Sequence, residues 1–186
     1  MEALLISTGI VALAEIGDKT QLLTLVLAAR YRRPWLVIAG IFAATLLNHA
    51  LAGAVGAWLS AAIGPDWMRW ILGLSFIAMA VWLLIPDRLD ESDESARNYG
   101  GIFLTTFVVF FLAEMGDKTQ IATVALAARF DSLVAVVVGT TVGMLIANAP
   151  VALFGEALAR RLPIRAVHAV AAAVFAVLGV GLLVWG

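Results

Sequence analysis

Long runs of apolar residues dominate the chain, and only a few short polar stretches interrupt them. A helix needs roughly 20 apolar residues to cross the ~30 Å hydrocarbon core of a bilayer. Six runs are long enough, so the pattern predicts six membrane-spanning helices. They lie at about 3–29, 35–62, 67–85, 101–128, 133–159 and 166–185.

The polar stretches divide these helices into two groups of three. The first run ends at Arg30-Tyr31-Arg32-Arg33-Pro34, and Gly64-Pro65-Asp66 and Pro163 are further separators. The longest polar stretch is acidic and lies between the third and fourth runs. We therefore expect a first three-helix repeat at 1–86, an acidic linker at 87–99 and a second three-helix repeat at 100–186.

One polar motif lies inside an apolar run and occurs twice. Glu15-Ile16-Gly17-Asp18-Lys19-Thr20-Gln21 returns 99 positions later as Glu114-Met115-Gly116-Asp117-Lys118-Thr119-Gln120. The longer segments 13–31 and 112–130 agree at 13 of 19 positions. Ionisable groups are costly inside a membrane, and their presence there indicates function.

Three helices per repeat is an odd number, so the two repeats must insert with opposite orientation. We expect an all-α integral membrane protein of six transmembrane helices, built as two inverted three-helix repeats. Secondary transporters share this design, with their sites near the midplane. At the same offset Gly40 matches Gly139, and His49 matches Asn148.

The amino-acid composition is that expected of a protein surrounded by lipid. The chain is 63% hydrophobic and 13% charged, whereas soluble domains are usually about 25% charged. No basic patch indicates nucleic acid. Without cysteine, and with only two histidines, thiolate and poly-histidine zinc sites are excluded. No serine or cysteine nucleophile accompanies a histidine base at the depth of the motif, so we do not expect an enzyme.

Arginines in the short loops set the expected orientation. With the N-terminus outside, two arginines fall in outer loops (Arg69 and Arg129) and eight in inner loops. The eight are Arg30, Arg32, Arg33, Arg88, Arg97, Arg160, Arg161 and Arg165. We therefore expect a multi-pass protein of the cell inner (plasma) membrane with both termini outside. Met1-Glu2 provides no basic leader, so the first helix is expected to be retained.

The motif is expected at mid-membrane. Residues 3–14 would form only ~18 Å of helix, too short to span, so the first helix should continue through Glu15 to about Ala29. On a continuous helix, Glu15, Asp18 and Lys19 share one face. Gly17 would allow close packing or a local break. His168, beside Arg165, is expected near the membrane edge.

Two such helices would supply many oxygen atoms. Carboxylate, carbonyl and water oxygens suit magnesium, calcium or manganese. Four unpartnered negative charges would be unreasonable in this setting, so a divalent cation, the lysines or protons should offset them. The candidate metal ligands are Glu15, Asp18, Glu114 and Asp117, and further ligands or tuning residues are Lys19, Lys118, Thr20, Thr119, Gln21, Gln120, His49 and Asn148.

An exchange of metal for protons (or sodium) at these acids predicts an antiporter. One copy of Glu-x-x-Asp-Lys could be a salt-bridged structural element, but two copies in inverted halves favour function. A passive divalent-cation channel is the alternative from another class, and coupling to protons separates the two.

The doubled Glu-x-Gly-Asp-Lys-Thr motif, in three-helix halves joined by an acidic loop, resembles the Gdt-type family of the cation/calcium exchanger superfamily. Eukaryotic Golgi manganese and calcium transporters and bacterial manganese exporters belong to that family. The resemblance covers essentially the whole chain. Because the chain lacks the extended N-terminal region of eukaryotic members and its linker is short, the bacterial manganese exporters are the nearer analogy.

The resemblance implies a cation antiporter whose motif acids bind the transported ion, here Glu15, Asp18, Glu114 and Asp117. We therefore expect Mn²⁺ export in exchange for protons, with Ca²⁺/H⁺ antiport as the closest alternative. The partners are a divalent metal ion, protons and lipid. No cofactor beyond the transported ion is expected, and homo-oligomerisation stays open.

Overall fold

The computed structural model describes residues 1–85, 99–155 and 164–185, and within these ranges every regular element is a helix. The expected acidic linker lies outside the described residues except for Tyr99, as do Arg88, Arg97, Arg160 and Arg161. The helices are α1 (Glu2–Glu15), α2 (Lys19–Tyr31), α3 (Pro34–Ala62), α4 (Pro65–Leu83), α6 (Ile102–Glu114), α7 (Lys118–Arg129), α8 (Leu133–Phe154) and α10 (Ile164–Trp185).

Four of these helices, α3, α4, α8 and α10, are long and apolar enough to cross a membrane. They correspond to four of the six expected spans, with ends shifted by a few residues. Pro34 and Pro65 start α3 and α4. Proline is well placed in the first turn of a helix, because its missing N–H would have no intrahelical acceptor there.

The other two expected spans are not continuous helices, and the prediction of one helix through Glu15 was wrong. α1 ends at Glu15 and α2 begins at Lys19, while α6 ends at Glu114 and α7 begins at Lys118. Gly17 and Gly116 have positive φ angles, of 87° and 78°. A helix cannot continue through that left-handed conformation, which glycine adopts readily.

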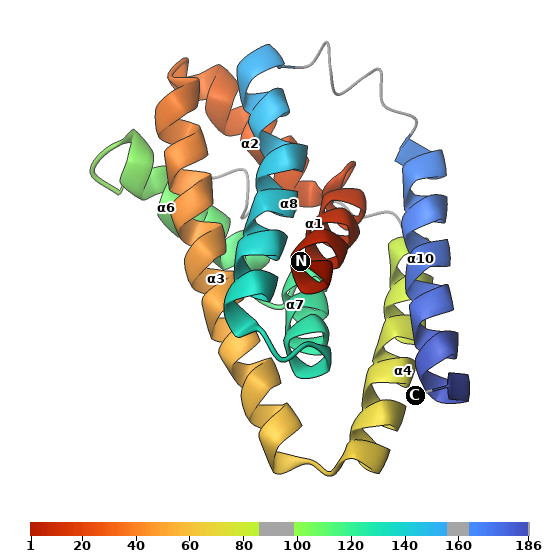
Figure 1. Ribbon diagram of the computed structural model, residues 1–186. Helices are drawn as coiled ribbons and strands as arrows, with labels where there is room; N and C mark the ends of the chain where they lie inside the picture. The colour runs from red at the N-terminus through yellow and green to blue at the C-terminus, as the bar shows by residue number, and fades with distance from the viewer. Residues whose placement is uncertain (86–98, 156–163, 186) are drawn as a thin grey trace.

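α4 and α10 form a pair of their own beside the other helices (Figure 1). Their Phe76 and Phe175 rings touch, with centroids 5.9 Å apart. A side chain at Gly73 would collide with Leu183, and one at Gly179 would collide with the backbone of α4. Two glycines thus allow the two helices to approach closely.

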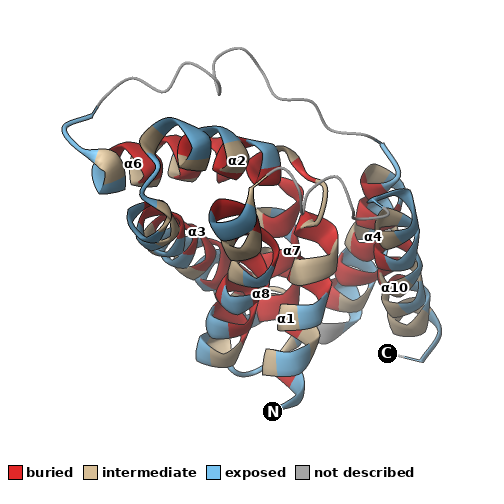
Figure 2. Cartoon of the chain, turned by 90° about the horizontal axis from the view of Figure 1, so that it is seen from above, coloured by how far each residue is buried: buried red, intermediate tan, exposed pale blue. Residues whose placement is uncertain are grey.

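The remaining helices form a bundle in which α1 lies along α8, and α3 packs against α6, α7 and α8. Seen from above, the buried residues gather in the middle of the molecule, where these helices face one another (Figure 2). α10 packs along α1, and α4 packs along α7, so the α4–α10 pair rests on one helix from each half of the chain.

Close contacts recur at the offset of the doubled motif. A side chain at Gly40 would meet Thr106 and the Phe103 carbonyl, and one at Gly139 would meet Ser7 and the Leu4 carbonyl. Thr106 and Phe103 lie 99 positions after Ser7 and Leu4. The two halves therefore make corresponding contacts with each other.

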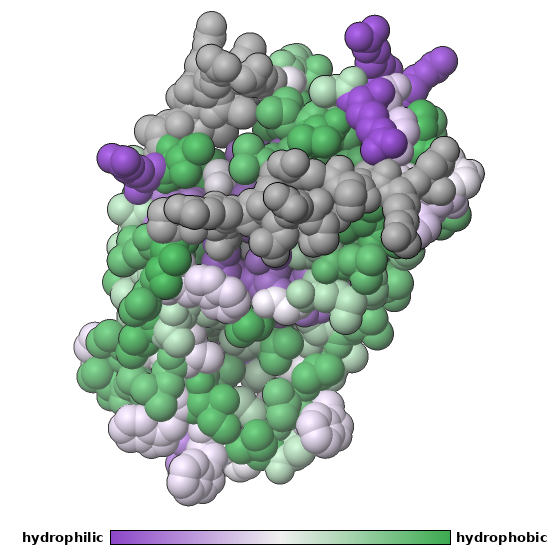
Figure 3. Space-filling model, turned by 180° about the vertical axis from the view of Figure 1, so that it is seen from behind, coloured by the Kyte–Doolittle hydropathy of each residue, from purple (hydrophilic) through white to green (hydrophobic). Residues whose placement is uncertain are grey.

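The surface is largely apolar over the helices, and strongly hydrophilic residues are visible at one end and in a patch near the middle of this face (Figure 3). Arg30, Arg32 and Arg33 are exposed, where α2 ends and α3 begins. Large apolar side chains elsewhere are also exposed, for example Leu74 at 57% and Val177 at 71%. Apolar exposure on this scale is expected of a surface that faces lipid rather than water.

Candidate cation-binding site

Each copy of the motif is a helix end followed at once by a helix start. Glu15 and Glu114 are the last residues of α1 and α6, and Asp18 and Asp117 are the N-cap residues of α2 and α7. Aspartate is favoured at an N-cap because a helix N-terminus carries partial positive charge. The break therefore turns two acids per motif out of the regular helical hydrogen bonding and towards the centre of the molecule.

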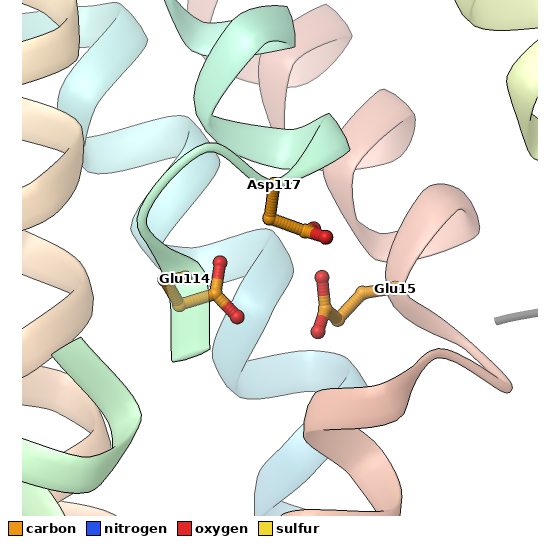
Figure 4. A group of neighbouring side chains, drawn as sticks. All are labelled: Glu15, Glu114 and Asp117. Carbon is orange, nitrogen blue, oxygen red and sulfur yellow. The ribbon is translucent and has the colours of Figure 1, made fainter. Parts of the chain in front are cut away.

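Three carboxylates from both halves of the chain meet at the breaks. Glu15, Glu114 and Asp117 each offer an oxygen, and these atoms lie within 4.8 Å of one another. All three side chains are buried, and in Figure 4 their carboxylates converge on a common space. This is the arrangement expected of oxygen ligands around one cation.

Several of these oxygens have no hydrogen-bond partner among the described residues. They are both carboxylate oxygens of Glu15 and Oε1 of Glu114. Thr119 donates to two of the others: its hydroxyl donates to Glu114 Oε2 at 3.0 Å, and its backbone N–H donates to Asp117 Oδ2 at 3.5 Å. Buried polar atoms are nearly always satisfied, so the open oxygens of Glu15 and Glu114 indicate a ligand or protons.

The fourth predicted ligand, Asp18, is not a member of this three-carboxylate cluster. Lys118 donates from Nζ to Asp18 Oδ1 at 2.6 Å, and both side chains are buried. The matching pair in the other direction is longer, with Lys19 Nζ 3.6 Å from Asp117 Oδ1 and Lys19 23% exposed. Each lysine thus pairs with the aspartate of the other half, which no reading of a single motif could predict.

The glutamine side chain of each motif hydrogen-bonds to the glycine in the break of the same motif. Gln21 Oε1 accepts from the Gly17 N–H at 3.0 Å, and Gln120 Oε1 accepts from the Gly116 N–H at 2.7 Å. Their amide groups donate outward, to the Ala147 carbonyl at 3.0 Å and to Asn48 Oδ1 at 2.8 Å. The glutamines therefore tie the breaks to α8 and α3 rather than lining the carboxylate cluster.

Three of the residues predicted as further ligands or tuning residues, Asn148, His49 and Thr20, lie on or beside the motif helices. Thr24 donates to Asn148 Oδ1 at 2.8 Å, which joins α2 to α8. His49 is fully buried, and neither of its ring nitrogens has a partner within the described ranges. It does not belong to the cluster of Glu15, Glu114 and Asp117. The hydroxyl of Thr20 is likewise buried without a partner.

Sequence reasoning missed two side chains that contact the motifs, those of Asn48, which accepts from Gln120, and of His168. The Nε2 atom of His168 lies 2.8 Å from the Ile16 carbonyl oxygen, which belongs to the first break. A side chain at Gly17 would collide with Ile164 and come close to His168. His168 therefore contacts the first copy of the motif, and its expected place near the membrane edge stays a prediction. No local pattern around His168 indicated this contact.

The two motif glycines should differ in their tolerance of a side chain. Both have positive φ, which costs an alanine about 1–2 kcal/mol. Gly17 is in addition covered by Ile164, whereas no atom of the described residues outside its own segment lies within 4 Å of the position that a Gly116 side chain would take. We expect Gly17→Ala to lower the thermal unfolding temperature in detergent by more than Gly116→Ala, the matched control. Equal decreases in the unfolding temperature of the two variants would contradict the close packing of Ile164 on Gly17.

The sequence matches a protein family described as "Divalent cation/proton antiporter GDT1" over residues 3–91 and 102–186. These two ranges contain both copies of the motif and every described helix, apart from Glu2 at the start of α1. The match thus includes the whole of the carboxylate cluster.

Two relatives illustrate the range of similarity. A Vibrio cholerae protein named "Putative manganese exporter" is 51% identical over 176 residues, which cover 94% of this chain and 87% of that protein. "GDT1-like protein 5" of Arabidopsis thaliana is 26% identical over 211 residues, which cover 94% of this chain and 92% of that protein. No solved structure matches the chain.

Proposed function

The chain belongs to the GDT1 family of divalent cation/proton antiporters, and from this premise we propose that it exports Mn²⁺ from the cell in exchange for protons. The observation that carries the proposal is the buried cluster of Glu15, Glu114 and Asp117. Its members come from both halves of the chain, and its open oxygens suit a hard divalent cation.

The net charge of the two motifs matches the charge of the ions that we propose they exchange. They contain four carboxylates and two lysines, so two negative charges remain when all six groups are ionised. One divalent cation neutralises this excess, and so do two protons. Because isolated charge is costly in a buried site, the cluster is stable with either cargo but not empty and fully ionised. Because the motifs must hold either the cation or protons, movement of the cation in one direction is coupled to movement of protons in the other.

We propose that the fold is an inverted repeat of two three-span halves, with α1–α2 and α6–α7 each serving as one broken span. The corresponding contacts of Gly40 and Gly139 support this, as do the reciprocal pairs Lys118–Asp18 and Lys19–Asp117. Broken helices at the repeat interface commonly place helix ends and free backbone groups around a transported ion.

Manganese is proposed from the name of the Vibrio cholerae relative, and calcium stays the alternative cargo. Since His49 lies outside the cluster, we propose a site of oxygen ligands only. Such a site has no soft ligand to favour manganese strongly over calcium. The pathway, rather than the ligand type, would then decide between the two.

The exposed arginines support the proposed orientation in the inner membrane. Arg30, Arg32 and Arg33 lie at one end of the molecule, where α2 ends and α3 begins, while Arg69 and Arg129 lie near the start of α4 and the end of α7. Positive residues favour the cytoplasmic side. We therefore place the α2–α3 turn inside and both termini outside.

The deciding experiment measures proton movement in proteoliposomes that hold a pH-sensitive dye. Adding Mn²⁺ outside vesicles with the wild-type chain is expected to drive proton release from the lumen, because each entering ion displaces protons from the carboxylates. Ca²⁺ is tested in parallel, and the metal that acts at the lower concentration is the preferred cargo. Protein-free vesicles are the control.

Two outcomes would contradict the proposal. Entry of Mn²⁺ without proton movement would indicate a channel, or coupling to sodium if a sodium gradient changes the rate. No entry of either metal through folded protein would remove the transport function altogether and leave the cluster a structural element.

A further inference from the structure

Two surface grooves meet at the end of the molecule where α3 leads into α4. The outer groove, of about 400 Å³, lies among the ends of α3 and α7 and the start of α4. The inner groove, of about 180 Å³, continues between α4 and α7. The two share four lining residues, Ile63, Met68, Leu72 and Ala128. They therefore form one continuous hollow, which we call the α4–α7 groove.

The walls of the α4–α7 groove run from the end of the molecule towards its middle. On α4 the inner groove extends from Met68 to Ser75, and on α7 it extends from Ala128 back to Ile121. Each wall covers about two helical turns, or roughly 10 Å. Apart from Ser75, whose hydroxyl donates to the Leu72 carbonyl at 2.9 Å, all side chains that line the inner groove are apolar. A narrow apolar groove parallel to membrane-spanning helices has the direction and the chemistry of a lipid acyl chain.

The outer end of the groove contains two arginines. Arg69 on α4 and Arg129 on α7 both line the outer groove, together with Ser60. Each guanidinium lies over an aromatic ring, that of Trp70 or Phe130, at 5.7 Å from the ring centroid. Stacking fixes the plane of a guanidinium, and its N–H donors point outward along the edge of that plane, where they match a phosphate group.

The charges around the groove favour an anion. Among the described residues that line the α4–α7 groove and the neighbouring 260 Å³ groove, Glu2 is the one acid, against Arg69 and Arg129. Asp66 and Asp131 are close to them in sequence but line none of these grooves. In the proposed orientation these are the two arginines on the outer side, where positive residues are usually scarce. Their common position at one groove therefore indicates a local anionic partner.

Tryptophans place this end of the groove at the depth of lipid headgroups. Trp67 and Trp70 are exposed at the start of α4, and Trp185 is exposed at the end of α10. α4 begins and α10 ends towards the bottom of Figure 1. Tryptophan is enriched at the boundary between membrane and water. A phosphate at this depth is that of a membrane lipid.

We infer that the α4–α7 groove binds one membrane phospholipid, with its phosphate held by Arg69 and Arg129 and one acyl chain lying along the apolar walls. Basic pockets between membrane-spanning helices are suited to anionic headgroups. The bound lipid joins α4 of the first half to α7 of the second. The inference goes beyond the proposed antiport and does not depend on it.

Lipid binding to the purified chain in detergent tests the inference. The probe is phosphatidylglycerol with two oleoyl chains, and binding is followed by native mass spectrometry and by thermal unfolding. Dioleoylglycerol has the same chains without the phosphate, and glycerol phosphate has the phosphate without the chains. We expect one tightly bound phosphatidylglycerol per chain and a rise in the unfolding temperature, and at least tenfold weaker binding of the other two compounds.

Two results with these probes would overturn the inference. Equal binding of phosphatidylglycerol and dioleoylglycerol would mean that the arginines do not recognise a phosphate. Equal stabilisation by glycerol phosphate would mean that the arginines bind a soluble anion and that the apolar groove has no part in it. Neither result concerns transport, so the outcome for antiport is decided separately.

Arginine substitutions test the headgroup contact. Arg129→Gln and Arg69→Gln are each expected to weaken phosphatidylglycerol binding about tenfold, because a charge-assisted hydrogen bond contributes about that factor. Binding of dioleoylglycerol should not change. Arg33→Gln is the matched control, since Arg33 is exposed at the start of α3, away from this groove. Wild-type affinity in both groove variants would contradict the assigned contact.

Filling the groove tests the acyl-chain contact. Ala128 lines both parts of the groove, so Ala128→Phe is expected to abolish tight phosphatidylglycerol binding. Ala54→Phe is the control, because Ala54 is exposed on α3 and lines none of these grooves. Retained binding by a folded Ala128→Phe chain would overturn the inference. Conversion of a wild-type dimer to a monomer by Ala128→Phe, with lipid binding unchanged, would also overturn it and assign the groove to a second copy of the chain.

Discussion

Replacing Glu114 by glutamine is expected to reduce Mn²⁺-driven proton release by at least about 100-fold. Glutamine keeps the shape of the side chain and can still accept the hydrogen bond from the Thr119 hydroxyl, but it has no charge and cannot carry a proton. Loss of a buried ionic contact costs about 3 kcal/mol or more. A loss of that size corresponds to roughly a hundredfold weaker interaction with the cation.

The same loss is expected for Glu15→Gln, because Glu15 belongs to the same cluster. Glu2→Gln is the matched control: Glu2 is exposed at the start of the same helix and should retain wild-type transport. Size-exclusion profiles confirm that each variant is folded. Transport by Glu114→Gln at the wild-type rate would mean that the ion passes elsewhere in the molecule.

Replacing Lys118 by methionine is expected to destabilise the protein by about 3–5 kcal/mol, because it leaves the buried carboxylate of Asp18 without its ionic partner. Lys19→Met is the control, since Lys19 is partly exposed and lies farther from its aspartate, at 3.6 Å. Thermal unfolding in detergent should rank Lys118→Met well below Lys19→Met.

A second substitution separates charge from shape. Asp18→Asn removes the stranded charge, so the double variant Asp18→Asn/Lys118→Met should recover much of the lost stability. Equal unfolding temperatures for the Lys118→Met and Lys19→Met chains would contradict the assigned asymmetry of the two pairs.

The long helices of this protein could be predicted well from the sequence, because a helix that crosses a membrane needs a long and apolar run of residues. The four long helices begin and end within a few residues of the apolar runs, and prolines mark two of the starts. The family was also evident, since the doubled motif identifies it and the family match includes both copies.

The breaks were harder to predict, because length alone favoured a continuous helix through Glu15. Gly17 was recognised as a residue that permits either outcome, and nothing local decides between them. The break is stabilised by distant partners: Gln21 reaches α8, and Gln120 reaches α3. Periodicity along one segment contains no information about such partners.

For the candidate site, the sequence indicated the acidic residues but not their pairing, and their role as metal ligands stays a prediction. Glu15, Glu114 and Asp117 meet as expected, whereas Asp18 pairs with Lys118 and remains outside the cluster. Contacts between segments about 100 residues apart depend on how the two halves pack. His168 is the clearest case, because its partner Ile16 lies 152 positions away.

The reciprocal lysine–aspartate pairs also determine when the protein can mature during its synthesis. Asp18 is made 100 residues before Lys118, so the first half of the chain is complete before this partner exists. Contacts so distant in sequence form late in folding. The first half is therefore expected to finish packing only after the second half is made, and a fragment that ends before Lys118 would lack this ion pair.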